Sequence, residues 1–248
     1  MELIVLGAGP AYTDRQGASG SAYLVVAGTT QLLLDLGQGS FPRLFPEVRP
    51  EDLDAVAITH LHPDHFVDLV SLRHYLRYEL HPARRLRVIG PAELGDRLDA
   101  LHAEPGFSAE ALDLEAIDGT ALRVGGLDLL PRKVTHTADS HAYRVSAGDG
   151  PGLVYSGDCG RADDLAPLIQ PGDTLLTEVS FGPGPVPPGA IHLDGPSVGR
   201  LASATGVGEI LLTHVQMRMD PDETVRSVQG VFDGPVRFVW PGSRATIG

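Results

Sequence analysis

The stretch Thr59–Phe66 (THLHPDHF) most constrains what this chain can fold into. Within six consecutive positions it carries four potential metal ligands: His60, His62, Asp64 and His65. On an extended backbone, side chains at positions i and i+2 point the same way, so His60 and His62 can reach one point, whereas Asp64 and His65 follow the turn at Pro63 and can reach a second. We therefore expect this loop to serve two metal ions. Imidazole and carboxylate ligands without a thiolate favour zinc, and manganese or iron would also suit them.

Three further candidate ligands stand where predicted strands end. His136 closes the run Leu127–Thr135, Asp158 follows LVYSG, and His214 follows EILLT. If Asp158 bridges two ions, one site consists of His60, His62, His136 and Asp158, and the other of Asp64, His65, Asp158 and His214. An open position shared by the ions would then hold a water molecule. His141 is the nearby alternative to His136.

The pattern of apolar residues alternates between strand and helix periods. Strands are expected at Glu2–Leu6, Ala22–Val26, Gln31–Leu36, Asp54–Ile58, Leu86–Ile89, Leu127–Val134, Ala142–Val145, Leu153–Ser156, Thr174–Thr177, Glu209–Thr213 and Val236–Trp240. Helices are expected from Asp64, at the helix N-terminus, to Leu80, from Pro91 to Leu101, and near Ser197–Ala204 and Asp222–Val231. Strand-rich halves with intervening helices predict an α/β (α+β) chain of two sheets packed face to face and covered by helices, in a single domain spanning 1–248.

Composition limits the partners and the compartment. The 248 residues have a formal net charge of −13, so we expect no long nucleic acid as a partner. The single cysteine, Cys159, rules out an intrachain disulfide and does not fix the redox compartment, and a role for it in redox chemistry or as a further ligand is the alternative to a buried structural thiol. MELIVLGAG lacks a basic region and a long apolar run, so we expect neither export nor membrane insertion, and a cytoplasmic location.

These motifs resemble a known family. The H-L-H-P-D-H loop, the later lone histidine, the S-G-D and the late T-H are similar, in that order, to the motifs of the metallo-β-lactamase superfamily. Within it, VTHTADSHAYRV (Val134–Val145) and TEVSF…HLD (Thr177–Asp194) resemble the ribonuclease Z-like phosphodiesterase branch. The resemblance implies a four-layer αββα sandwich, two zinc ions at one end of the sheets, and hydrolysis by a metal-bridging hydroxide.

The resemblance also implies roles for individual residues. It places a metal-ligand histidine on His136. It further implies that His192 protonates the leaving group, with Glu178 as its partner, and Asp64 could also orient the nucleophile. The alternatives are that His192 caps the helix entered at Asp194 and that Glu178 is a solvated loop charge. A homodimer is expected by analogy with the family.

Two departures from the ribonuclease Z pattern limit the expected substrate. Thr177-Glu178-Val179-Ser180 stands where that family has His-Glu-Ala-Thr, and only eleven residues separate Arg144 from Ser156, where the family inserts a long tRNA-clamping arm. We therefore expect a phosphodiesterase that cleaves a small-molecule or short nucleotide-like phosphodiester. The alternatives are a carbonyl or sulfate ester hydrolase (a lactonase, thioesterase, β-lactamase or arylsulfatase) and a non-catalytic metal-binding relative.

Overall fold

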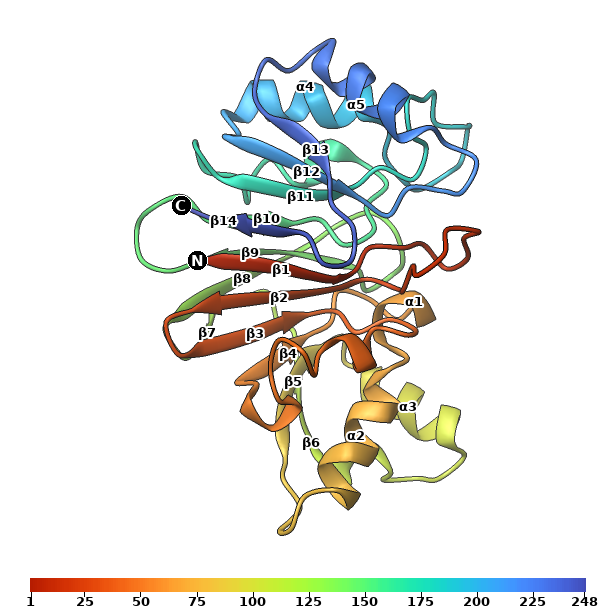
Figure 1. The fold of residues 1–248 in the computed structure, drawn as a ribbon, viewed down its shortest axis with the longest axis vertical. Helices are drawn as coiled ribbons and strands as arrows, with labels where there is room; N and C mark the ends of the chain where they lie inside the picture. The colour runs from red at the N-terminus through yellow and green to blue at the C-terminus, as the bar shows by residue number, and fades with distance from the viewer.

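Two seven-stranded sheets pack face to face in the computed structural model, which describes residues 1–248, and helices cover both outer faces (Figure 1). The first sheet has the order β14-β1-β2-β3-β4-β5-β6. Its strands are β1 Glu2–Gly7, β2 Ala22–Ala27, β3 Thr30–Leu34, β4 Ala55–Ala57, β5 Leu86–Gly90, β6 Leu112–Ala116 and β14 Arg244–Thr246.

The second sheet has the order β13-β12-β11-β10-β9-β8-β7. Its strands are β7 Leu122–Val124, β8 Leu127–Lys133, β9 His141–Ser146, β10 Leu153–Tyr155, β11 Thr174–Glu178, β12 Glu209–Thr213 and β13 Val236–Phe238. Strands β10 to β13 run parallel, as do β3 to β6 in the first sheet. The loops that follow parallel strands therefore gather at one edge of each sheet, where α/β proteins usually place their ligands.

Five α-helices complete the layers. On the first sheet lie α1 Pro63–Phe66, α2 Leu69–Tyr78 and α3 Leu94–His102, and on the second lie α4 Gly195–Thr205 and α5 Pro221–Gln229. Short 3₁₀ turns occupy Phe41–Arg43, Pro50–Asp52, Ser108–Glu110 and Ala162–Asp164. No helix in the molecule combines the length and the apolar character that a membrane crossing requires.

Three apolar clusters hold the layers together. A cluster of 22 buried residues fills the space between the sheets, and clusters of 21 and 18 join each sheet to its own helices. Because both faces of each sheet are covered, the central strands are buried at almost every position, as in EILLT of β12, where only Glu209 is partly exposed. The predicted α/β sandwich is confirmed.

The structure corrects the expected helices in the first half. The helix expected from Asp64 to Leu80 is two helices, interrupted at Val67 and Asp68, because the Asp68 carboxylate accepts a 2.9 Å hydrogen bond from the Phe41 amide while its own amide donates to Leu36. Asp64 makes no capping bond. The helix expected from Pro91 begins at Leu94. Strands β6, β7 and β14 were not predicted: each lies at a sheet edge, β7 and β14 have only three residues, and β6 is largely exposed, so their apolar patterns are weak.

Candidate metal centre

The side chain of Asp35 holds the ligand-bearing loop that follows β4 in place. Its carboxylate accepts hydrogen bonds from the Thr59 amide (2.7 Å), the Thr59 hydroxyl (2.9 Å), His65 Nδ1 (2.8 Å) and the Tyr155 hydroxyl (2.7 Å). Asp35 lies just after β3 with a φ of 57°, a left-handed conformation that Asp tolerates better than most residues. Asp35 thus orients both Thr59 and His65 without being a candidate ligand itself.

Glycine allows the neighbouring loop to lie directly against the ligand loop. A Cβ atom added at Gly37 would stand 1.9 Å from the Asp64 carbonyl oxygen, so only glycine fits there. The close approach permits hydrogen bonds from the Ser21 amide to the Asp64 carbonyl (2.9 Å) and from the Leu36 amide to the His65 carbonyl (2.7 Å). The segment before β2 and the segment after β3 thus both hydrogen-bond to the backbone of the ligand loop.

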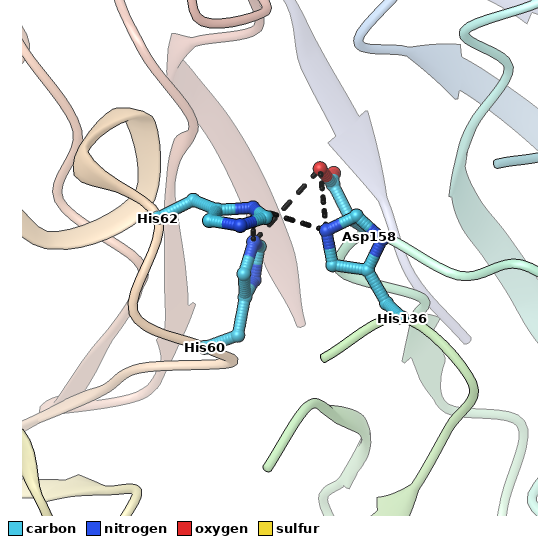
Figure 2. Close-up of side chains that lie close together, drawn as sticks. All are labelled: His60, His62, His136 and Asp158. Carbon is cyan, nitrogen blue, oxygen red and sulfur yellow. Dashed lines mark hydrogen bonds and ion pairs between the residues drawn. The ribbon is translucent and has the colours of Figure 1, made fainter. Parts of the chain in front are cut away.

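The first group of candidate ligands consists of His60, His62, His136 and Asp158 (Figure 2). His60 Nε2 and His136 Nε2 lie 3.1 and 3.0 Å from His62 Nδ1. The same two Nε2 atoms lie 3.9 and 3.6 Å from Asp158 Oδ2. The four ligand atoms all lie within 4.8 Å of one another, so they surround one point.

The second group consists of Asp64, His65, Asp158 and His214, all buried. His214 Nε2 lies 3.2 Å from Asp64 Oδ2 and 3.4 Å from Asp158 Oδ1, and His65 Nε2 lies 3.3 Å from the same Asp158 oxygen. Asp158 therefore presents Oδ2 to the first group and Oδ1 to the second. The structure brings together all seven residues that the sequence nominated, and leaves His141 outside both groups.

The donor set fits a pair of divalent cations. His65 Nε2 and Asp158 Oδ1 are buried and form no hydrogen bond with each other or with any other group. Such atoms are costly in a folded protein unless an ion or a water molecule satisfies them. Because His65 Nδ1 is bonded to the Asp35 carboxylate, its Nε2 is left as the free ring nitrogen, the arrangement that a metal-binding histidine requires.

The protonation states of the histidines in the site also favour the binding of cations. Burial, followed by the positive charge on His65, lowers the pKa of His60 well below its ordinary value, so His60 is neutral and has a lone pair for a cation. Burial lowers the pKa of His65 as well, but Asp158 and Asp35 more than offset it and raise that pKa well above its usual range. Without cations, a proton on His65 thus compensates the buried carboxylates, and a bound metal ion would displace it.

Glu178 and His192 form a pair beside the second group. Glu178 ends β11, and its Oε1 accepts hydrogen bonds from His192 Nδ1 (2.9 Å) and from the Cys159 amide (3.0 Å), while Oε2 accepts one from the Ser180 amide (2.9 Å). Burial lowers the pKa of His192, but the hydrogen bond and charge of Glu178 outweigh it and raise that pKa to about 9. Glu178 is buried, so it is not a solvated loop charge. Asp194, and not His192, caps helix α4.

A cavity of about 320 Å³ opens onto the ligands. Five of the predicted site residues line it: His62, Asp64, Asp158, His192 and His214. With Nδ1 of His192 bonded to Glu178, the Nε2 atom is the one available to a molecule in this cavity. Two residues of the site were not predicted from the sequence. The Tyr155 hydroxyl contacts Asp35, and no local pattern indicates it. The Ser180 hydroxyl contacts the ring nitrogens of His192 and His214, and its place two positions after Glu178 is the signal that could have found it.

Other residues singled out from the sequence are structural. The guanidinium of Arg144 is buried and donates two hydrogen bonds, of 2.8 and 2.9 Å, to the carboxylate of Asp173, away from the cavity. Cys159 is buried outside both ligand groups, and its burial raises the pKa of the thiol to about 12.

Two facing sheets between helices, with histidines and aspartates gathered at one end, define a class of metal-dependent hydrolases. The comparison with known families agrees: residues 30–215 match the model described as "Beta-lactamase superfamily domain", and the chain belongs to that superfamily.

Individual relatives span nearly the whole chain. The protein ML1173 of Mycobacterium leprae is 34% identical over 90% of this chain and 80% of its own. The probable metallo-hydrolase YhfI of Bacillus subtilis is 27% identical over 98% of this chain and 100% of its own, and its crystal structure superposes with a TM-score of 0.87 at 26% identity over 99% of both chains.

More distant relatives include nucleic-acid enzymes. Ribonuclease Z of Pyrobaculum arsenaticum is 24% identical over 100% of this chain and 98% of its own. The crystal structure of a diphosphatase from the PhnP family has a TM-score of 0.78 at 16% identity, over 100% of this chain and 98% of that one, a likeness that extends to the fold alone. The predicted resemblance to the metallo-β-lactamase superfamily and its ribonuclease Z-like members is confirmed.

Proposed function

We propose that this metallo-hydrolase is a binuclear zinc-dependent phosphodiesterase that cleaves a small or short nucleotide-like phosphodiester. One observation carries the proposal: a single buried carboxylate, Asp158, faces two groups of ligands with a different oxygen toward each. A carboxylate in this position can join two cations that act on one substrate. Manganese or iron could replace zinc without changing the argument.

The proposed ligands divide into two sets that share Asp158. His60, His62 and His136 would complete one set, and Asp64, His65 and His214 the other. When bound, the two cations would lower the pKa of a water molecule toward neutrality and neutralise the charge that develops on the phosphate. Asp64 in addition reaches the cavity, where its carboxylate could orient the attacking water.

His192 would supply the proton to the departing oxygen. Its pKa of about 9 keeps the ring protonated at neutral pH, and nearby cations would bring that value closer to neutrality. Glu178 is a positioning residue in this scheme, because it fixes Nδ1 and leaves Nε2 turned toward the cavity. A proton donor at this place suits an ester whose leaving group is an alkoxide.

The size of the substrate follows from charge and from the β9–β10 connection. Residues 147–152 form a short hairpin there, with no long arm that could hold a folded RNA. The net charge of −13 repels a long polyanion, whereas a small anionic diester would be attracted by the local charge of two dications. The name of the ribonuclease Z relative supports phosphodiester chemistry.

A panel of three substrates tests the proposal. The zinc-loaded protein would be assayed with bis-(p-nitrophenyl) phosphate, a lactone and a chromogenic cephalosporin, with Asp158→Asn as the inactive control. We expect hydrolysis of the phosphodiester that depends on Asp158. Hydrolysis of the carbonyl substrates alone would favour the lactonase, thioesterase or β-lactamase alternative, and no hydrolysis of any substrate would favour a non-catalytic relative.

A further inference from the structure

A second hollow, of about 440 Å³, adjoins the metal cavity. Its wall comes from the loop that follows β1, from the 3₁₀ turn at Phe41–Arg43 and from Trp240 near the C-terminus. Pro10 lines both this hollow and the metal cavity. Val215 lines the hollow, while its neighbours His214 and Gln216 line the metal cavity. The two spaces are therefore neighbours, which is the arrangement that a ligand with two binding groups requires.

The hollow is cationic in a strongly acidic chain. Arg15 and Arg43 are its charged lining residues, no Asp or Glu lines it, and neither guanidinium forms an ion pair with a carboxylate. Most other arginines of the chain are paired, for example Arg144 with Asp173. Two guanidinium groups without a carboxylate in a half-buried recess lack the anion that such groups usually bind.

The orientation of both guanidinium groups is fixed by neutral groups. Arg15 donates to the carbonyl oxygens of Val215 (3.2 Å) and Met219 (3.3 Å), and its Cζ lies 5.6 Å from the ring centroid of Trp240. Arg43 donates to the carbonyl oxygen of Gly17. A guanidinium has five N–H donors, so donors remain on each of them. Carbonyl oxygens and an aromatic ring hold a cation in place without neutralising it.

We propose that this hollow binds a second phosphate group of the substrate while the diester to be cut lies at the metal ligands. The substrate class is then a nucleotide or short oligonucleotide that carries a phosphate in addition to the scissile diester. The inference rests on the proposed function, because it takes the neighbouring cavity as the place of hydrolysis. It adds a specificity element that the metal ligands alone do not provide.

Binding to the metal-loaded protein tests this assignment without relying on turnover. Trp240 is the single tryptophan of the chain and lines the hollow, so its fluorescence reports on occupancy. The probes are thymidine 5′-phosphate, thymidine 3′,5′-bisphosphate and inorganic phosphate. We expect the bisphosphate to bind roughly 10- to 100-fold more tightly than the monophosphate, as charge-assisted hydrogen bonds typically provide, and to change the Trp240 emission.

Two variants and a matched control locate the effect. Arg15→Gln and, independently, Arg43→Gln should each reduce the preference for the bisphosphate by about tenfold or more. Arg84→Gln removes the same charge from an exposed arginine in the α2–β5 loop that forms no ion pair, and should leave the preference intact. A second variant matters because Arg15 also ties two loops together and its replacement could impair folding.

Three results would overturn the inference: equal affinity for the two nucleotides, a preference that survives both substitutions, or a Trp240 response to inorganic phosphate with no gain for the bisphosphate. The last result would mean that the hollow takes a separate anion. If the bisphosphate preference holds but bis-(p-nitrophenyl) phosphate is not hydrolysed, the proposed function fails and the phosphate-binding hollow stands.

Discussion

Replacing Asp158 by asparagine probes the centre of the site with little change in shape. The side chain keeps its volume but loses the charge that faces both ligand groups, whose ring nitrogens lie 3.3 to 3.9 Å from its oxygens. Residues that merely orient a metal ligand typically contribute 10- to 100-fold to metal affinity. A ligand shared by both ions should contribute more, so we expect each affinity to fall by more than about 100-fold.

The same loss can be expressed as stability. Metal at a concentration 100-fold above its dissociation constant stabilises the folded state by about 2.7 kcal/mol per site, and the substitution would remove most of that gain. For a chain of this size, about 2 to 4 °C of melting temperature corresponds to each kcal/mol, so the zinc-dependent rise in melting temperature should shrink by roughly 5 to 11 °C per site.

Metal content after dialysis and melting curves with and without zinc would measure both effects. Asp149→Asn, at the exposed β9–β10 hairpin, removes the same charge away from the site and serves as the control. We expect the control to bind two equivalents of metal and Asp158→Asn to bind less than one. If Asp158→Asn keeps two equivalents and the full thermal shift, the bridging role is refuted.

Three other substitutions follow from the geometry. His192→Gln should lower kcat/KM for a diester with an alkoxide leaving group by roughly 10²- to 10⁴-fold, because only the protonated ring donates. It should also remove the decline that the wild type shows as the pH rises from neutrality toward about 9, the range in which the His192 ring loses its proton once cations lower its pKa; an unchanged pH profile would contradict the role. His136→Gln should reduce metal content, while His141→Gln, its matched control outside both groups, should not. Arg144→Gln should destabilise the fold by about 3 to 5 kcal/mol in denaturant titrations, since it leaves the buried Asp173 carboxylate unpaired, and should not alter metal stoichiometry.

The candidate ligands could be found from the sequence because each is marked locally. His60 and His62 share one side of an extended segment, and His136, Asp158 and His214 each follow an apolar run. Strand ends of parallel sheets meet at one edge, so the spatial convergence of these residues follows from the fold class. The same reasoning favoured His136, which closes a predicted strand, and left His141, only five positions away, as the alternative. In the structure His136 follows β8, whereas His141 begins β9 and lies outside both ligand groups.

Helix boundaries were less predictable, for a physical reason. The apolar spacing from Phe66 to Leu80 continues through Asp68, but a tertiary hydrogen bond from the Phe41 amide ends the first helix there. The pairing of Arg144 with Asp173 was equally hidden, because 29 positions separate the two side chains in the sequence. Such contacts depend on how the sheets register, which no local pattern encodes.

The sequence by itself determined the chemistry of this protein: which side chains could bind cations, that they stand at strand ends, and that the strands are buried on both faces. Only the tertiary structure decided how that chemistry is arranged. It turned the two oxygens of Asp158 toward different histidines, used Glu178 to hold His192, and set Arg15 and Arg43 around a hollow beside the ligands. The reason is that residue type and periodicity fix local conformation, whereas the direction of a side chain in a shared site depends on packing between segments that are distant in the chain.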